Sequence, residues 1–421
     1  MPQPAAGNYA FPDWIASECV RLMTESRECF EYASHDLDSE YGKSFPIGPN
    51  VRYKYPQMYN PIDGAEFGGG AVNRKTGQAS VTEWVQIPLE ASTWDKMLSM
   101  EKSKAEISKN YLKSAMQQLM AEAEARFMRF MFLNTNNVVG ALGTTPTTWA
   151  TYAAADSRLF QLSGLQDQQG NITTAKMMET LTANSLLQLI APTELERQYK
   201  KNYVGEAAGA RWHRSNACVQ HTTGIWATVA TGVTVATSGQ SGSSINVACT
   251  TGDTFVAGDK IDFAGSNAVN PWIRSSRGFK AQFTITADAV GVASAATLQI
   301  YPAMVGPGSP EQNVDALPIA GDIVTMWRGT SMSNAAAKTG VLGLRTNKNA
   351  FGIICPEIPM PKAGGSIVMS AHDQDPDSKM SIALMEFFDP KSHAWGWRWD
   401  SVFGFAKIYS DRAACLIAGL E

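Results

Sequence analysis

The sequence has few charged residues and no excess of positive charge. Charged residues make up 18% of the 421 positions, and 35 Lys and Arg stand against 39 Asp and Glu, for a net charge of −4. A protein that reads nucleic acid needs a basic surface to hold phosphates, and this composition offers none. With 44% hydrophobic residues, the chain is also no disordered protein. We therefore expect a folded protein of two or three domains.

Close cysteine pairs and long apolar runs are missing as well. The six cysteines are scattered, unlike those of a small disulfide-linked domain, so we expect them to be reduced. They are Cys19, Cys29, Cys218, Cys249, Cys355 and Cys415. No run of eighteen apolar residues occurs, and the first residues lack the pattern of a signal peptide. These absences predict a soluble protein made in the cytosol, with no membrane segment.

Metal ligands and nucleophiles are sparse. His213, Cys218 and His221 lie within nine residues, but a structural zinc site needs four ligands and no second pair is evident. A catalytic cysteine needs a positioned base and oxyanion donors, which a sequence does not reveal. A thiol hydrolase built on Cys218 is a distant alternative, and buried or loop residues are the favoured interpretation.

A run of alternating aspartates resembles a calcium loop only in part. Asp373, Asp375 and Asp377 have the spacing, yet Ser378 and Leu384 stand where the loop needs its glycine and its glutamate. No glycine-rich phosphate loop with the required Lys and Ser or Thr occurs. The sequence therefore predicts no enzyme, no metal ion and no cofactor.

Two segments near the N-terminus have clear periodicity. Apolar residues recur at helical spacing over residues 13–32, with acidic residues on the other face, which predicts an amphipathic helix. Residues 50–61 and 79–89 alternate apolar and polar side chains around a glycine-rich stretch at 62–77. This pattern predicts a long hairpin. Because an isolated two-stranded ribbon is marginally stable in water, the hairpin should lie on a neighbouring surface.

The strongest helical pattern covers residues 94–133. Apolar side chains follow one another at steps of four, and neither Pro nor Gly interrupts them. At about 1.5 Å per residue, a helix of this length reaches roughly 45 Å or more. We expect it to be the spine of a domain.

Weaker patterns follow the spine helix. A polar break at 134–146 precedes helical patterns at 174–190 and 193–205, and a helix-tolerant stretch follows Gly329 before several strands at the C-terminus.

The amino-acid composition changes between Thr222 and Arg328. The first part of this block, residues 223–253, is rich in Thr, Val, Ser and Gly, nearly free of charge and broken by turn formers, and short strands continue to about Arg328, which predicts an all-β module. The stretches FVAGDKIDFAG (255–265) and LPIAGDIVTM (317–326) share one sequence pattern, in which Asp259 and Asp322 should shape a turn that leads into a strand. The residues before and after the block should form one discontinuous α+β body, with the module inserted in a loop.

The order of these parts resembles the major capsid proteins of tailed bacteriophages with the HK97-type fold. The β module narrows the resemblance to coat proteins of the P22 type. Its matching stretches are ATGVTVATSG (230–239) and GDKIDFAG (258–265), and WDSVFGFAKIYSDRAACLIAG (399–419) resembles the closing segment of that family. The resemblance implies an α+β capsid fold of the HK97 type with an all-β barrel insertion domain.

The resemblance also implies a division of the chain into six parts. They are an N-terminal arm with its helix (1–44), an extended hairpin loop (45–91), the spine helix of the peripheral domain (92–133), the first part of the axial and peripheral domains (134–222), the inserted barrel (223–328) and the second part of those domains (329–421).

A structural function follows from the resemblance. Copies of the chain would form hexamers and pentamers of an icosahedral virion shell, assembled in the bacterial cytoplasm with a scaffolding protein and a portal protein. The shell would enclose double-stranded DNA through non-specific contacts. Acidic residues of the arm would contact the scaffold, and the candidates are Asp13, Glu18, Glu25 and Glu28. The hairpin tip would reach an adjacent subunit, with Glu66, Phe67, Arg74 and Lys75 as candidates.

A carbohydrate-binding or tail-associated adhesin is the alternative from another class. Trp395, Trp397 and Trp399 alternate at strand spacing, as a sugar-binding ladder would. One packed face of a strand has the same spacing, so the pattern alone does not separate the two interpretations.

Overall fold

The computed structural model places most of the chain in two compact units. The description covers residues 11–26, 29–35, 38–39, 48–56, 74–92, 112–162, 169–183, 203–207, 209–226, 232–271, 273–309, 311–327, 337–348, 350–356, 358, 367–375, 379–389, 391 and 394–419. Among these, unit 1 takes the residues within Met1–Tyr55, Lys75–Phe127 and Gly352–Ala406, and unit 2 takes almost all the others.

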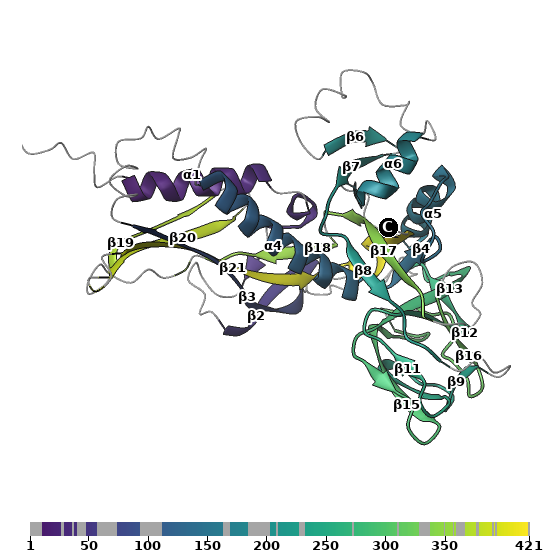
Figure 1. Cartoon of the computed structure of the whole chain (residues 1–421). Helices are drawn as coiled ribbons and strands as arrows, with labels where there is room; N and C mark the ends of the chain where they lie inside the picture. The colour runs from purple at the N-terminus through teal and green to yellow at the C-terminus, as the bar shows by residue number, and fades with distance from the viewer. Residues whose placement is uncertain are drawn as a thin grey trace, which may run out of the picture. The chain divides into compact units, whose positions relative to one another are not determined.

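Unit 1 is built on a seven-stranded sheet (Figure 1). Six strands follow the order β1-β2-β3-β21-β20-β19, and β18 pairs with β21 outside this path. Their bounds are Asp38–Ser39 (β1), Gly48–Pro56 (β2), Arg74–Ser92 (β3), Phe351–Ile354 (β18), Ile367–Gln374 (β19), Ser381–Asp389 (β20) and Ala394–Lys407 (β21). The strands β2 and β3 of the predicted hairpin are neighbours, and β3 also pairs with β21 from Ala394 to Phe405. The hairpin is therefore no isolated ribbon where it is described.

Helix α1, Phe11–Ser26, lies against β19 and β20 (Figure 1). Its apolar face is buried, as its spacing predicts, through Ile15, Cys19 and Met23 among others. After it, the short 3₁₀ helix Phe30–Tyr32 buries Phe30 between the rings of Phe127 and Phe403, at centroid distances of 5.3 and 5.5 Å. The predicted helix is thus confirmed up to Ser26.

The spine helix is described over its C-terminal half, as α4, Lys113–Leu133. The predicted start near residue 94 lies outside the described residues, because 93–111 are not among them. Within α4, Met116, Leu119, Ala123 and Phe127 are fully buried, as the four-residue spacing predicts.

The body of unit 2 is a second seven-stranded sheet. Six strands follow the order β4-β22-β17-β5-β7-β6, and β8 pairs with β17. Their bounds are Asn137–Val139 (β4), Gln169–Thr173 (β5), Tyr203–Ala207 (β6), Ala210–Arg214 (β7), Val219–Thr222 (β8), Thr339–Asn347 (β17) and Ala414–Gly419 (β22). The helices of this unit are α5, Trp149–Gln161, α6, Ala175–Ala183, and the short α8, Ser410–Ala413.

Helix α5 covers this sheet with an aromatic cluster. The rings of Tyr152 and Trp212 lie 5.1 Å apart between centroids and are tilted by 59°, and Leu159 and Ile417 belong to the same buried group.

In the part of the chain that the structure describes, none of the helices combines the length and the apolar character that a membrane span requires.

The block between the two halves of the body forms a closed six-stranded barrel, in the order β10-β15-β13-β12-β16-β9. The bounds are Val233–Val235 (β9), Gly242–Ala248 (β10), Lys260–Val269 (β12), Ser276–Ile285 (β13), Ala295–Met304 (β15) and Ile323–Met326 (β16), with a small pair β11, Thr254–Phe255, and β14, Ala289–Val290. The all-β module is confirmed, and with it the α+β class with an inserted barrel.

Several secondary-structure predictions need correction. Sequence analysis overlooked α5 and β17, and residues 203–205, predicted to end a helix, begin strand β6. Strand β17 escaped because nearly all its side chains are buried on both faces, so the alternation that indicates a strand is absent.

Candidate functional site

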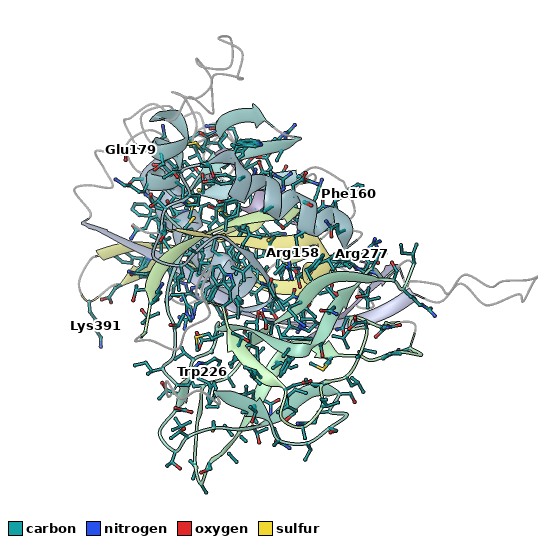
Figure 2. The ribbon with its side chains drawn as sticks, turned by 90° about the vertical axis from the view of Figure 1, so that its right-hand side faces the viewer. Arg158, Phe160, Glu179, Trp226, Arg277 and Lys391 are labelled. Atoms are coloured by element: carbon teal, nitrogen blue, oxygen red, sulfur yellow. The ribbon has the colours of Figure 1, made fainter. Side chains whose placement is uncertain are left out.

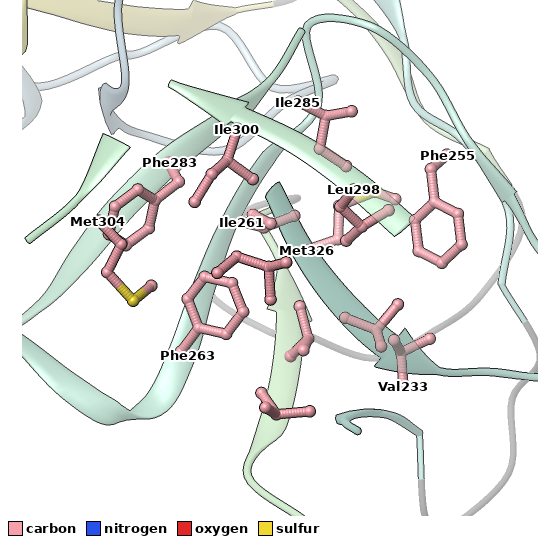
Figure 3. Close-up of a cluster of buried hydrophobic side chains, with 14 of the residues drawn as sticks. Val233, Phe255, Ile261, Phe263, Phe283, Ile285, Leu298, Ile300, Met304 and Met326 are labelled. Atoms are coloured by element: carbon pink, nitrogen blue, oxygen red, sulfur yellow. The ribbon is translucent and has the colours of Figure 1, made fainter. Parts of the chain in front are cut away.

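The barrel has an apolar interior of its own (Figure 3). Phe263 and Phe283 meet inside it at 5.6 Å between ring centroids, and both are at most 1% exposed. Aliphatic side chains from all six strands complete the core. They include Val233, Val247, Ile261, Leu298, Ile300 and Val324. Burial of this apolar area stabilises the barrel.

The chain enters and leaves the barrel through paired segments, which we call the neck. Strand β8 pairs with the start of β17, with Thr222 opposite Thr339. The backbone N–H of Thr223 donates to Lys338 O at 2.9 Å, and the N–H of Lys338 donates to Thr223 Oγ1 at 3.0 Å. The two connections of the insertion thus lie side by side.

Asp259, a predicted turn residue, holds the neck to the barrel. Its carboxylate accepts the backbone N–H of Val256 at 2.9 Å, which shapes the turn before β12. It also accepts His221 Nε2–H at 2.8 Å and the backbone N–H of Gly224 at 3.1 Å. Asp259 is fully buried, and these donors replace the water that a buried carboxylate loses. The prediction of a turn residue is confirmed, and the bond to the neck is additional.

Lys260, the next residue, holds the barrel to the end of the spine helix. Its Nζ donates to Phe132 O at 2.9 Å, to Thr135 O at 2.6 Å and to Thr284 Oγ1 at 2.8 Å. The ammonium also lies 4.7 Å from the centre of the Phe132 ring. The last carbonyls of a helix have no partner within the helix, and their partial negative charge favours a cation. A barrel side chain therefore caps α4.

Burial lowers the pKa of Lys260 well below its usual value, against the opposing effect of the Asp259 carboxylate. Lys260 as a whole residue is 4% exposed. All three of its donor positions are used by the oxygen acceptors named above, so the group is satisfied without a direct carboxylate partner.

A second set of polar contacts joins strand β13 to the body. Gln282 Oε1 accepts the backbone N–H of Val138 at 2.9 Å, and Gln282 O accepts Asn136 Nδ2–H at 2.8 Å. Arg158 of α5 (Figure 2) donates from Nη2 to Lys280 O at 3.0 Å. Burial lowers the pKa of Arg158 to about 10. We call Asp259, Lys260, Gln282 and Arg158 with these partners the junction.

The junction is suited to positioning and not to chemistry. Its hydrogen bonds are directional and buried, so they fix how the barrel meets the body. Among the described residues, no group of three or more His, Cys, Asp or Glu could hold a metal ion. His213 and His221 are buried on β7 and β8, and Cys218 is half-buried between those strands.

The candidate scaffold-contacting residues lie in or near helix α1. Asp13 and Glu25 are exposed and Glu18 is half-buried. Glu18 and Glu25 both pair with Arg21, at 2.6 and 2.5 Å. Glu28 lies outside the described residues.

The candidate hairpin-tip residues are described only in part. Glu66 and Phe67 lie outside the described residues, and Arg74 and Lys75 open strand β3. The tryptophans of the alternative interpretation lie on β21, where Trp399 is 2% exposed and Trp397 is half-buried. A sugar-binding ladder needs exposed rings, and Trp399 does not offer one.

Sequence reasoning missed Lys260 and Gln282. The sequence held one signal for Lys260, which is its position. It directly follows the turn residue Asp259 and opens a strand that contributes residues to the core. Its partners Phe132, on α4, and Thr135, just after it, are 128 and 125 positions away, and no sequence pattern shows such a contact.

One comparison with known proteins identifies a family. Residues 90–411, well over half of the chain, match the family model described as P22 coat protein, gene protein 5. No curated protein matches the sequence.

Solved capsid structures are similar at low identity. The capsid of Ralstonia phage GP4 is 7% identical, with 91% of this chain and 86% of that one covered and a TM-score of 0.42. The capsid structure of cyanophage P-SCSP1u is 9% identical, with 94% and 89% covered and a TM-score of 0.37. The CUS-3 coat protein I-domain is 18% identical over 24% of this chain and 98% of that one, with a TM-score of 0.19. Because all three TM-scores are below 0.5, the family assignment rests on the match of residues 90–411 alone.

The match spans the barrel, the junction and both halves of the body. Its members are structural capsid proteins and not enzymes, which also decides against the adhesin alternative. The chain belongs to the P22 coat protein family: it is a major capsid protein of a tailed phage, and its copies form the icosahedral shell of the virion.

Proposed function

We propose that the shell is built from hexamers and pentamers around a scaffolding protein, with a portal protein at one position and double-stranded DNA inside. The six predicted parts of the chain, from the arm at 1–44 to the second body part at 329–421, are the units of this assembly. A net charge of −4 supports a wall that confines DNA without reading it.

Helix α1 is the proposed scaffold contact, and one observation carries this proposal. The helix buries its apolar face against β19 and β20 and leaves Asp13 and Glu25 exposed on the other side. Arg21 is the counter-charge on that side, bonded to Glu18 and Glu25. Exposed ion pairs of this kind contribute little to stability, so a basic partner segment can replace Arg21 at small cost.

Charge changes on α1 test this contact. Glu18→Gln with Glu25→Gln should lower shell yield when the chain is expressed with the other head proteins, while Arg21→Gln should maintain or raise it. Glu122→Gln on α4 is the matched control, because Glu122 forms a similar exposed pair with Arg126 at 3.0 Å. Electron microscopy of the assembled particles is the readout. Equal yields for all four proteins would contradict a scaffold contact at α1.

The hairpin is proposed to lie over an adjacent subunit with its tip, which includes Glu66, Phe67, Arg74 and Lys75. Its pairing with β21 supports this, because β3 is anchored in the sheet from Ser80 to Ser92. Limited proteolysis between residues 57 and 73 should be fast in free subunits and slow in shells. Cleavage at the same rate in both would overturn the proposal.

A further inference from the structure

A row of buried residues crosses the body sheet of unit 2 beneath helix α5. Asn171 on β5 lies opposite Arg345 on β17 and beside Trp212 on β7. Arg345 in turn lies opposite Cys415 on β22. Because residues paired across strands point to the same side of a sheet, these four side chains share one face. Cys415 and Trp212 belong to one buried cluster with residues of α5, so this is the face that α5 covers.

The row is polar for the centre of a domain. Asn171 and Arg345 are almost completely buried, at positions where a sheet beneath a helix normally presents apolar side chains. Arg345 Nη2 donates to Asp156 Oδ1 of α5 at 2.7 Å, and it also donates to Gln169 Oε1. Helix α5 is therefore held to the sheet by polar contacts as well as by its apolar cluster.

A cavity of about 30 Å³ lies at the β4 end of this row. Asn137 of β4 and Arg158 of α5 are among its lining residues, and Arg158 Nε donates to Asn137 Oδ1 at 2.9 Å. Asn137 lies beside Cys415, the next residue of the row. A water molecule needs about 10–15 Å³ and at least two polar partners, so this cavity has room for water at the edge of the row.

Two side chains on this buried face have hydrogen-bonding groups that no described residue satisfies. Neither Nδ2 nor Oδ1 of Asn171 has a protein partner, and the hydroxyl of Tyr152 on α5 has none either. The Tyr152 ring lies 5.1 Å from that of Trp212, the neighbour of Asn171, so both side chains belong to the same part of the interface. A buried amide or hydroxyl that is left unpaired destabilises the fold.

These groups fit a neutral molecule that both donates and accepts hydrogen bonds. An anion would need donors alone, and a metal ion would need lone pairs alone. The Asn171 amide offers a donor and an acceptor, and the Tyr152 hydroxyl can be either. The positive charge of Arg345 is already offset by the Asp156 carboxylate. Water meets these requirements and is small enough for a packed interior.

We propose that ordered water molecules bind between α5 and the sheet, held by the Asn171 amide and the Tyr152 hydroxyl, and that α5 carries the barrel on this hydrated layer. A water molecule accepts a hydrogen bond from Nδ2 and donates one to Oδ1 or to the tyrosine oxygen, so it satisfies these groups as a bonded side chain would. The bound water is part of the folded body, and its loss should loosen α5.

Helix α5 is the part of the body that the barrel contacts near this layer. Arg158 Nη2 donates to Lys280 O at 3.0 Å, and Gln161 O accepts Asn270 Nδ2–H at 2.8 Å. Closely packed apolar surfaces transmit strain, whereas a bridging water molecule can exchange one polar partner for another. The hydrated layer thus lets α5 follow small movements of the barrel while the sheet stays intact.

A nearly isosteric substitution tests the proposal, because Tyr152→Phe removes only the hydroxyl group. If water binds there, a hydrogen bond is lost, and amide hydrogen exchange in α5 should become about tenfold faster while exchange in β22 changes little. If the hydroxyl is buried without any partner, its removal relieves a penalty and exchange in α5 becomes slower. Slower or unchanged exchange in α5 would overturn the proposal. Equal acceleration in β22 would do so too, because α5 would then not open separately from the sheet.

Tyr301→Phe is the matched control. The Tyr301 hydroxyl forms a direct hydrogen bond with Ser410 Oγ at 2.7 Å. Its loss should speed exchange around β15 and α8 and leave α5 unchanged, which gives the size of the effect of one direct bond.

A second variant tests whether the two groups share the same water. Asn171→Leu should also speed exchange in α5, and its combination with Tyr152→Phe should have less than the product of the two single effects. Fully multiplicative effects would contradict a shared layer. A density map of the shell that resolves ordered water should show it between α5 and β5, in contact with both side chains. Such a map without water at this place would refute the proposal independently of any variant.

Discussion

The interior of the barrel and the junction that attaches it are both buried, yet they use opposite kinds of side chain. The interior is filled by aliphatic and aromatic groups such as Phe263, Phe283 and Leu298. The junction buries Asp259, Lys260 and Gln282. Apolar burial is roughly proportional to area and has no direction, whereas each buried hydrogen bond requires one partner in one place. The barrel core thus supplies stability, and the junction supplies a single orientation on the body.

The largest effect is expected from the core. Phe263→Ala removes a fully buried ring and should destabilise the barrel by about 3–5 kcal/mol. Amide hydrogen exchange should become faster in β12, β13 and β16 and stay nearly unchanged in β17 and β22. The exposed ring of Phe160 on α5 provides the control, since Phe160→Ala should change little. Faster exchange in the body strands by the same factor would show that barrel and body open as one unit, which would break the comparison.

The stability of the junction should depend on its hydrogen bonds more than on side-chain volume. Lys260→Ala leaves Phe132 O and Thr135 O without their donor and should cost about 2–4 kcal/mol. Lys260→Met keeps most of the packing but removes the same donor, so it should cost nearly as much, about 1–3 kcal/mol. Exchange at the C-terminal turn of α4 measures both. A much smaller loss for Lys260→Met than for Lys260→Ala would mean that Lys260 acts through its stem and not through its ammonium.

The pH dependence of the junction has a defined sign. Because the pKa of Lys260 is lower in the folded chain than in the unfolded one, folding releases a proton between the two pKa values. Stability should therefore rise as pH increases toward about 10, where the unfolded amine titrates. Lys260→Met should remove this rise. Lys338→Met, at an exposed position of the neck, should leave it intact.

A buried carboxyl on the outer face of strand β12 gives the next effect. Burial raises the pKa of Asp262 to about 6, against opposing effects of Thr325, Lys280 and Arg158. A raised carboxyl pKa makes the folded barrel less stable as pH rises from about 4 to about 6. Asp262→Asn should therefore stabilise the barrel at pH 7 by about 1–3 kcal/mol and change little at pH 4. Thermal unfolding at the two pH values is the measurement, and an equal change at both would contradict the assignment.

The smallest effects separate the two turn aspartates. The Asp259 carboxylate binds both the turn and the neck, whereas the Asp322 carboxylate accepts a hydrogen bond only from its own turn among the contacts described. Asp259→Asn should cost about 1–2 kcal/mol and loosen the neck, while Asp322→Asn should cost about 0.5 kcal/mol and leave the neck unchanged. Exchange at Thr223 and Gly224 reads the difference. A looser neck in Asp322→Asn would remove the distinction between the two turn aspartates.

The sequence was sufficient for the barrel because its signals are local. Turn formers and alternating Thr and Val mark the strands, and the aspartates of the GD turns contact residues three positions away. The junction could not be predicted, because Lys260 meets α4 across more than a hundred positions. Strand β17 was missed for another reason, because burial on both of its faces leaves no alternation to detect.

The paired neck also bears on how this chain could change in evolution or in the laboratory. Because Thr222 and Thr339 are neighbours across two strands, the whole barrel could be exchanged for another domain, or for a short turn, without stretching the body sheet. The α4 carbonyl capped by Lys260, and the groups of the body and neck bonded to Gln282, Lys280 and Asp259, would then need new partners. A subunit of this kind is a ready carrier for a foreign domain, repeated once for every copy in the shell.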